Sequence, residues 1–303
     1  MNQPNVELSP NSNPAPMMGW AWVKAGFQLF RKQPVEMLTL FFAYMFLTMA
    51  IGLIPFVGQF LPMILVPVFS MSFLQACRHI ENGQRVHPNL LLLGFRSPAF
   101  SRLLTLGSLY LIAAMLAIGA STLVDDGAFW NYLTTQKPID PKDTQSLPDP
   151  GMFWGMLCSA VVYIPALMAF WFAAPLIVWQ EMGLGKSVFY SFFAVRGAGK
   201  AFVIYGLSWL LIGVMLPTVL SLIIVLIVGK PILGVIIMLP VSLMLTVVMY
   251  CSFYPTYISI FGRPQDKPST AVDQVTDATA NTAPKQPAEV DSADPDHTKP
   301  GGN

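Results

Sequence analysis

Long stretches without a charged residue are the feature of this sequence that most restricts its fold. These stretches are residues 37–77, 103–124, 150–180, 201–229 and 231–262. The hydrocarbon core of a bilayer is about 30 Å thick and is crossed by roughly 20 helical residues. In lipid an α-helix satisfies its backbone polar groups within the segment, so each stretch is long enough to cross as a helix.

The first stretch is long enough for two crossings and contains a turn signal. Residues 54–58 read IPFVG, and their Pro and Gly favour a turn. The predicted spans are residues 37–54, 59–77, 103–124, 153–178, 201–228 and 232–257. Only 11% of the residues are charged, against about 25% in soluble domains, and the mean hydropathy is +0.57. We therefore predict an all-α integral membrane protein with six transmembrane helices.

Lys and Arg are distributed unequally between alternate loops. One set of loops holds Lys24, Arg31, Lys32, Arg78, Arg85, Arg96, Arg102, Lys186, Arg196 and Lys200. The other set holds Lys137, Lys142 and Lys230. Because basic residues accumulate on cytoplasmic loops, the first set is predicted to be cytoplasmic, together with the N and C termini.

The two ends of the chain differ from the membrane domain, which is predicted to cover residues 17–262. Residues 1–16 contain no Lys, no Arg and no apolar core, so they do not resemble a cleavable signal peptide and are predicted to be disordered. Residues 263–303 are rich in Pro, Asp and Thr and lack a long apolar run, which predicts a disordered cytoplasmic tail. A solvated tail is favoured, and a tether for a protein partner is the alternative.

A short amphipathic stretch precedes each predicted pair of spans. In the first, apolar residues recur at helical spacing, namely Trp20, Val23, Phe27 and Phe30. The second stretch is 88–96 and the third is 186–196. A helix with one apolar face is typical of the membrane interface, so three short cytoplasmic interfacial helices are predicted.

The second and third stretches align without gaps at an offset of 100 residues. The matched pairs are Glu81 with Glu181, Gly83 with Gly183, and Arg96 with Arg196. This predicts three repeated helical-hairpin units in the same orientation. The alternative is that every cytoplasmic elbow needs Gly to turn and Arg to anchor, which does not explain the paired glutamates.

The matched charges are the candidate site residues. We predict that Glu81 pairs with Arg96 and Glu181 with Arg196, each pair closing a cytoplasmic elbow in a structural or lipid-contacting role. Basic side chains near the membrane surface attract anionic lipid headgroups by about 1 kcal/mol each. The bilayer, and anionic headgroups within it, are accordingly the expected partners.

The usual signs of chemistry are missing from the sequence. The predicted spans contain no ionisable Asp, Glu, Lys, Arg or His, which disfavours a proton relay or an intramembrane protease. The sequence has no HExxH, P-loop, dinucleotide or GxSxG motif. Cys77 and His79 form a lone C-x-H pair, for which interfacial anchoring is favoured over metal binding. We therefore expect no enzyme activity, no catalytic, cofactor-binding or metal residues, no cofactor and no nucleic acid partner.

Proline and glycine interrupt the apolar stretches. Prolines fall within the predicted spans at positions 62, 67, 165, 175, 217 and 240. A proline frees a carbonyl and kinks its helix, which a transporter can use to line a cavity, although a packing role is favoured. The glycines Gly107, Gly119, Gly206 and Gly213 are predicted to allow close helix approach.

Five segments of the sequence are AAPLIVWQ at 173–180, SFFA at 191–194, YGLSW at 205–209, GFQLFR at 26–31 and IPFVG at 54–58. These segments resemble an uncharacterised family of β-proteobacterial inner-membrane proteins. The resemblance covers residues 17–262 and implies a bacterial inner membrane and a six-span fold, but no reaction. More remotely, the stretch from Glu181 to Arg196 resembles membrane domains attached to bacterial glycerophosphodiester phosphodiesterases. The phosphodiesterase catalytic domain is absent, so that activity is not implied.

Two functions remain after these exclusions. The favoured one is a non-enzymatic envelope scaffold or a protein that binds lipid or partner proteins. The alternative is a small-molecule permease or exporter component. A water-filled central cavity lined by spans two, four and six would favour transport, whereas a packed bundle with a basic cytoplasmic rim would favour a scaffold.

Overall fold

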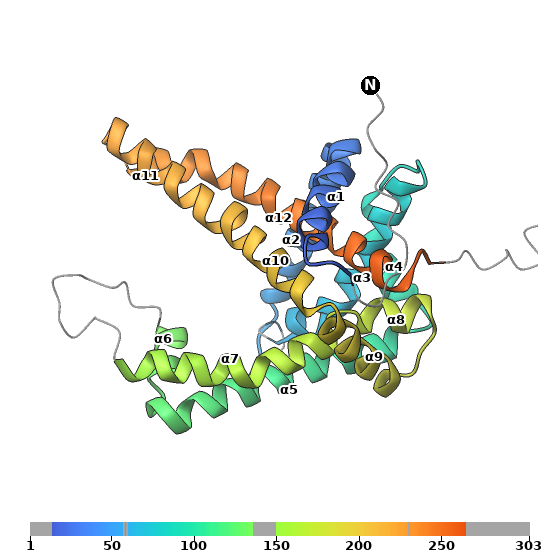
Figure 1. The fold of residues 1–303 in the computed structure, drawn as a ribbon, viewed down its shortest axis with the longest axis horizontal. Helices are drawn as coiled ribbons and strands as arrows, with labels where there is room; N and C mark the ends of the chain where they lie inside the picture. The colour runs from blue at the N-terminus through green and yellow to red at the C-terminus, as the bar shows by residue number, and fades with distance from the viewer. Residues whose placement is uncertain (1–13, 57, 59, 136–149, 230, 265–303) are drawn as a thin grey trace, which may run out of the picture. The chain divides into compact units, whose positions relative to one another are not determined.

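The computed structural model describes residues 14–56, 58, 60–135, 150–229 and 231–264. All regular elements in these ranges are helices, and six of the helices are long and apolar enough to cross a membrane (Figure 1). The candidate spans are Pro34–Gly52, Leu61–Glu81, Phe100–Asp125, Gly151–Trp179, Gly199–Val228 and Ile232–Phe261. The predicted all-α fold class with six spans is confirmed. The predicted disordered segments, residues 1–16 and 263–303, lie mostly outside the described residues.

The first half of the chain contains seven of the helical elements. They are α1 (Met18–Lys32), α2 (Pro34–Gly52), α3 (Leu61–Glu81), the short 3-10 helix η1 (Pro88–Leu92), α4 (Leu93–Arg96), α5 (Phe100–Asp125) and α6 (Ala128–Thr135). The others are α7 (Pro150–Phe170), α8 (Ala173–Trp179), α9 (Leu184–Gly197), α10 (Gly199–Trp209), the π-helical turn η2 (Leu210–Met215), α11 (Leu216–Val228) and α12 (Pro231–Phe261).

The spans form three hairpins, each preceded by a short helical segment. Helix α1 precedes the hairpin of α2 and α3, η1 with α4 precedes α5 and α7, and α9 precedes the hairpin of α10–α11 with α12. In Figure 1, α5 lies beside α7, and α11 lies beside α12. Helix α3 packs against both α5 and α12, so it connects all three hairpins. This order of elements matches the three predicted units.

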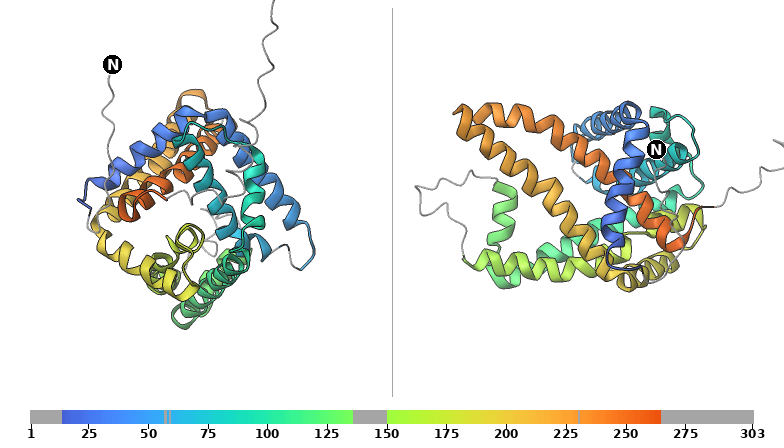
Figure 2. Two further views of the ribbon diagram at one scale, coloured as in Figure 1. Left: turned by 90° about the vertical axis from the view of Figure 1, so that its right-hand side faces the viewer. Right: turned by 45° about the horizontal axis from the view of Figure 1, so that its top comes forward.

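Helix α1 is a packing element rather than a solitary interfacial helix. It lies beside α12 and also packs against α10 (Figure 2). The buried residues are Gly19, Trp22, Val23, Gly26, Leu29 and Phe30. Trp20, which was placed on the predicted apolar face, is 38% exposed. The packed face of α1 therefore includes Gly19 and Gly26, which were not predicted, and the interfacial role of this helix stays a prediction.

The glycines with a close neighbour differ from those predicted. A Cβ atom added at Gly107 would overlap the backbone of Ile64 in α3, as predicted for a close helix contact. At Gly119 and Gly206 nothing lies within 4 Å of such an atom, and at Gly213 the nearest atom is 3.6 Å away. The close approach at Gly26, where a Cβ would be 2.6 Å from the Cβ of Ser252, was not predicted.

The two matched elbows have different backbone conformations. After α3, Gly83 adopts the left-handed region with φ 75°. After α8, Gly183 has φ −66°, and Glu181 takes the left-handed conformation with φ 53°. The aligned glycines therefore differ in backbone conformation, although the order of helices around them repeats.

Candidate functional site

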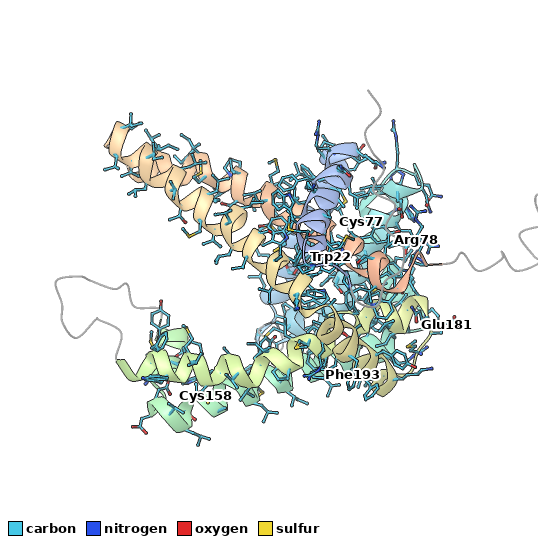
Figure 3. All side chains as sticks on the ribbon, viewed as in Figure 1. Trp22, Cys77, Arg78, Cys158, Glu181 and Phe193 are labelled. Atoms are coloured by element: carbon cyan, nitrogen blue, oxygen red, sulfur yellow. The ribbon has the colours of Figure 1, made fainter. Side chains whose placement is uncertain are left out.

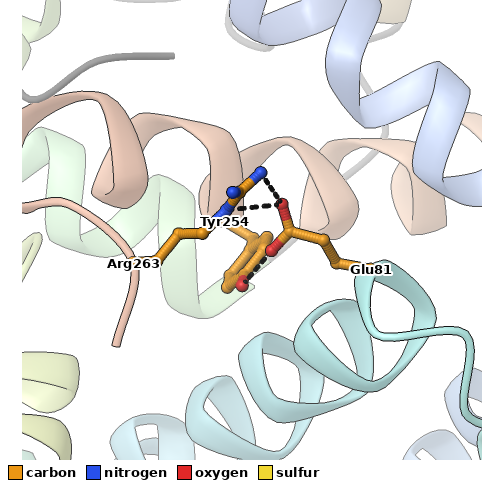
Figure 4. Close-up of polar contacts among 3 residues, drawn as sticks. All are labelled: Glu81, Tyr254 and Arg263. Carbon is orange, nitrogen blue, oxygen red and sulfur yellow. Dashed lines mark hydrogen bonds and ion pairs between the residues drawn. The ribbon is translucent and has the colours of Figure 1, made fainter. Parts of the chain in front are cut away.

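Glu81 joins the end of the second span to the end of the sixth. It is the last residue of α3, and its Oε2 accepts a hydrogen bond of 2.6 Å from the hydroxyl of Tyr254 in α12. Its Oε1 accepts bonds from Nε and Nη2 of Arg263 at 3.2 and 3.0 Å (Figure 4). The carboxylate thereby links segments more than 170 residues apart in the sequence.

The structure gives Glu81 partners other than the predicted Arg96. Arg96 ends α4, is exposed, and lines a pocket that is described below. The physical reason is that α3 packs against α12, which brings Tyr254 and Arg263 to the carboxylate. The pairing of Glu81 with Arg96 is corrected accordingly, while a structural or lipid-contacting role for these residues stays a prediction.

The second predicted pair lies around the turn between α8 and α9, where Figure 3 places Glu181. The backbone carbonyls of Glu181 and Met182 accept bonds from Nη1 of Arg102 at 3.4 and 3.1 Å. Arg196 is exposed near the end of α9. The ion pair between Glu181 and Arg196 stays a prediction, and the observed role of this turn is to anchor the start of α5 through Arg102.

We expect the hydrogen bond between the buried Tyr254 hydroxyl and Glu81 to contribute more to the free energy of unfolding than the ion pair between Arg263 and Glu81. The Arg263 side chain is 76% exposed and that of Glu81 is 24% exposed, so solvent should limit this ion pair to less than about 1 kcal/mol. A hydrogen bond from a buried hydroxyl to a carboxylate contributes about 1.5–3 kcal/mol. Double-mutant cycles with Glu81→Gln, Tyr254→Phe and Arg263→Gln, read by unfolding in detergent, measure both couplings. A larger coupling to Arg263 than to Tyr254 would contradict this ranking.

A cavity of about 290 Å³ lies among the second, third, fourth and sixth spans. Most of its lining residues are aromatic, including Phe73 from α3, Tyr110 from α5, Phe170 from α7 and Tyr250 from α12. Phe73 and Tyr250 are stacked with ring centroids 4.5 Å apart, and Tyr110 and Phe170 are stacked at 4.6 Å. No charged residue or histidine is among the lining residues.

The outer edge of the cavity lies on faces that are exposed in the isolated chain. Val66 of α3 is 40% exposed and Leu167 of α7 is 41% exposed, and both line the cavity. The inner end includes Phe172 and Tyr257, which are 2% exposed. Since these helices are candidate spans, the exposed faces contact lipid, and the cavity therefore adjoins the bilayer.

The fourth span is interrupted where it borders this cavity. Helix α7 ends at Phe170 and α8 begins at Ala173. In an unbroken helix the amide of Phe172 would donate to the carbonyl of Met168. Instead, the amide donates to Oγ of Ser191 at 2.9 Å, and the Ser191 hydroxyl donates to the Met168 carbonyl, also at 2.9 Å. A hydroxyl from α9 thus replaces one helical hydrogen bond.

Pro175 contributes to this interruption, because it has no N–H to donate to the carbonyl of Trp171. Side chains inserted into the hydrogen-bond ladder are a known cause of sharp helix kinks. The sequence showed Pro175 as a potential kink but gave no sign that Ser191, 19 residues from Phe172, would complete it. The kink sets the positions of Trp171 and Phe172 at the cavity wall.

Two tyrosine hydroxyls at the cavity are bound within the protein, whereas the buried indole N–H of Trp171 has no hydrogen-bond partner among the described residues. The hydroxyl of Tyr110 donates to the carbonyl of Phe170 at 3.0 Å, and that of Tyr257 accepts a bond from Nε2 of Gln180 at 3.1 Å. An aromatic surface without ionised groups is suited to holding an apolar molecule.

Metal-binding side chains are not gathered in the part of the chain that the structure describes. Cys77 and Cys251 are buried, Cys158 is partly buried, and all three thiols are free. Figure 3 shows Cys158 on α7 far from Cys77 on α3. The predicted preference for anchoring over metal binding at Cys77 and His79 stays a prediction.

A curated relative now places the chain in a family. The chain is 34% identical over 247 residues to a probable inner membrane protein of Burkholderia thailandensis, and the alignment covers 80% of this chain and 91% of the relative. The chain belongs to the family of this inner-membrane protein. As a member with six candidate spans, it is a multi-pass protein of the inner membrane.

The remaining comparisons give no further relative. No protein-family model matches this inner-membrane protein, and no solved structure matches it. The family assignment carries no reaction or ligand, because the relative's description names only its location. The resemblance to phosphodiesterase membrane domains stays a sequence-based expectation.

Proposed function

We propose that this inner-membrane protein binds an apolar molecule of the membrane, such as a lipid acyl chain, in the aromatic cavity, and that it is not an enzyme. The observation that carries this proposal is the 290 Å³ cavity that adjoins the bilayer at Val66 and Leu167. Its volume is at the lower end of the range for ligand pockets, about 300–1,000 Å³.

Selectivity in such a site depends on packing rather than on the hydrophobic effect. A lipid chain entering from the bilayer leaves an equally apolar solvent, so little free energy comes from desolvation. Contact with aromatic rings is then the main reason for a lipid chain to prefer the cavity over the bilayer. The stacked pair of Phe73 with Tyr250 offers a rigid wall for that contact.

Orientation and further partners are part of the same proposal. The basic loops, including Arg85, Arg96 and Lys200, face the cytoplasm together with both termini, by the positive-inside rule. Anionic headgroups bind these loops, and the tail after Pro264 is available to a protein partner. Both features fit a scaffold or lipid-binding role in the envelope.

The kinked fourth span supports a second candidate, a permease or exporter component for an apolar small molecule. The cavity is lined by spans two, four and six, with Tyr110 from span three, which are the spans expected to line a transport cavity, but its lining is mainly aromatic. Interrupted helices beside a cavity are a feature of many transporters. Profiling a deletion strain for metabolites and lipids separates the candidates, because a lost gradient of a small molecule with unchanged lipids favours transport.

Filling the cavity should abolish chain binding. Ser70 lines the cavity from α3, and Ser70→Leu adds three carbon atoms in place of the hydroxyl. The protein is reconstituted in nanodiscs of phosphatidylcholine with a photoreactive group at the chain end, and adducts are mapped by mass spectrometry. We expect adducts on Tyr163 and Phe170 to fall several-fold in the variant, because the added volume occludes the site.

The control for this experiment is Thr105→Leu, which changes a hydroxyl residue to leucine on an exposed face of α5 outside the cavity. Its adduct pattern should equal that of the wild type. If cavity residues are labelled no more than exposed Leu226 and Ile227 in wild-type protein, the proposed occupancy is wrong.

A further inference from the structure

A second, polar pocket of about 660 Å³ lies at the elbow between α3 and α5. Its polar lining residues are His79, Gln84, Arg85, His87, Asn89 and Arg96. Leu90 and Leu93 complete the wall. This pocket shares no lining residue with the aromatic cavity.

The charge in this pocket is positive and uncompensated. No acidic residue is among its lining residues. The carboxylate of Glu81, which lies at the same elbow, accepts a hydrogen bond from Tyr254 and forms an ion pair with Arg263. Neither Arg85 nor Arg96 forms an ion pair with a described residue. Guanidinium groups present paired donors that match phosphate oxygens, and the imidazole rings offer further N–H donors.

The polar pocket continues into an apolar one. Arg96 and Leu93 also line an adjoining cavity of about 310 Å³. The rest of that cavity is formed mainly by apolar side chains, among them Met71 of α3, Leu103 of α5 and Val178 of α8. A molecule that fills both volumes is anionic at one end and apolar at the other.

The walls of the polar pocket are held by packing and hydrogen bonds. Gly94 of α4 lies against α3, and a Cβ added there would be 2.7 Å from Cγ1 of Val68. The Gln33 side chain donates to the carbonyl of Gln84 at 2.8 Å and accepts from the amide of Val86 at 3.0 Å. Arg85 lies between these two anchored residues, so the pocket is largely formed before a ligand binds.

The position of the polar pocket along the spans indicates which part of the bilayer surrounds it. The second span ends at Glu81 and the third begins at Phe100, so the pocket lies where helices leave the hydrocarbon region. Phospholipid headgroups occupy this level of the bilayer, and basic pockets between transmembrane helices bind them.

From the basic lining, the shared Arg96 and the adjoining apolar cavity, we propose that this elbow is a binding site for an anionic phospholipid. Its phosphate contacts Arg85 and Arg96, and one acyl chain enters the cavity beside Met71 and Val178. The proposal rests on the proposed binding of anionic headgroups to the basic loops and names the site, and it does not depend on chain binding in the aromatic cavity.

The test uses the full chain in detergent, titrated with dioleoyl phosphatidylglycerol and followed by native mass spectrometry. Arg85→Gln with Arg96→Gln should weaken binding of this lipid at least tenfold, which corresponds to about 1.4 kcal/mol. Arg31→Gln removes one positive charge from the exposed face of α1 and should leave binding within twofold of wild type. Dioleoyl phosphatidylcholine serves as the zwitterionic control and should bind equally to all variants. The unfolding midpoint of each variant establishes that it is folded.

Three results would overturn the proposal. Equal loss of binding in Arg31→Gln and in the double variant would show a general surface charge effect. Displacement of the lipid by equimolar glycerol 3-phosphate would show a site for soluble phosphate esters, and equal affinity for the dihexanoyl lipid would show that the apolar cavity holds no chain. Because the Ser70→Leu labelling experiment uses a zwitterionic lipid and a different cavity, failure of one site is distinguishable from failure of the other.

Discussion

Gly107→Ala should destabilise the protein by at least about 1–3 kcal/mol, the usual cost of forcing extra volume into a packed interior. Gly107 of α5 is buried against α3, and an added Cβ would be 2.6 Å from the carbonyl carbon of Ile64 and closer still to its oxygen. The obstacle is backbone, which cannot move aside by a change of rotamer. The two helices must therefore separate. The measurement is the unfolding midpoint in detergent.

Gly119→Ala provides a control on the same helix. Nothing lies within 4 Å of a Cβ at this position, so only helix propensity changes. In water that propensity favours alanine by about 1 kcal/mol, so the control should be neutral or slightly stabilised. If Gly107→Ala and Gly119→Ala behave alike, α3 and α5 do not pack as closely as the structure shows.

Ser191→Ala should be the second severe change. The substitution removes the hydroxyl that binds both the Phe172 amide and the Met168 carbonyl, at a residue that is fully buried. Each buried group left without a partner costs about 1–3 kcal/mol. We expect a loss of roughly 2–6 kcal/mol, since two groups are affected. Hydrogen exchange should also rise at residues 168–176, next to the cavity.

The matched control is Ser208→Ala. The Ser208 hydroxyl bonds only the carbonyl of Ile204 in its own helix, and that carbonyl is part of the helical ladder. The expected cost is therefore below about 1 kcal/mol, with no local increase in exchange. Unchanged exchange at residues 168–176 in Ser191→Ala would contradict the role of Ser191 in completing the kink.

The number and nature of the spans followed from local composition. Each uncharged stretch produced a helix, and the IPFVG segment separated α2 from α3 as predicted. A chain segment in lipid has few alternatives to a helix. Residues such as Leu106 and Val248 could therefore be assigned to helical spans without knowledge of the tertiary structure. The ionisable residues lie near the ends of the candidate spans, as Glu36, Arg102 and Lys200 illustrate.

The candidate sites were less predictable because they combine distant segments. Arg96 was predicted to be a site residue, but its surroundings are a basic pocket rather than the Glu81 carboxylate. The aromatic residues around the 290 Å³ cavity come from four spans, and single-chain periodicity does not show which faces meet. The notable signal that was present is the density of Arg and His between α3 and α5.

The sequence by itself determined the all-α class, the six crossings and the placement of charge near their ends. These features depend on the free energy of transferring each segment from water to lipid, and not on which helix packs against which. Tertiary structure alone decided that Glu81 binds Tyr254 and Arg263, that Ser191 completes the kink beside Trp171, and that Gly107 and Gly26 are close contacts. Each of these depends on which helix faces which. In a membrane that choice rests on close packing and a few hydrogen bonds, which leave only a weak pattern in the sequence.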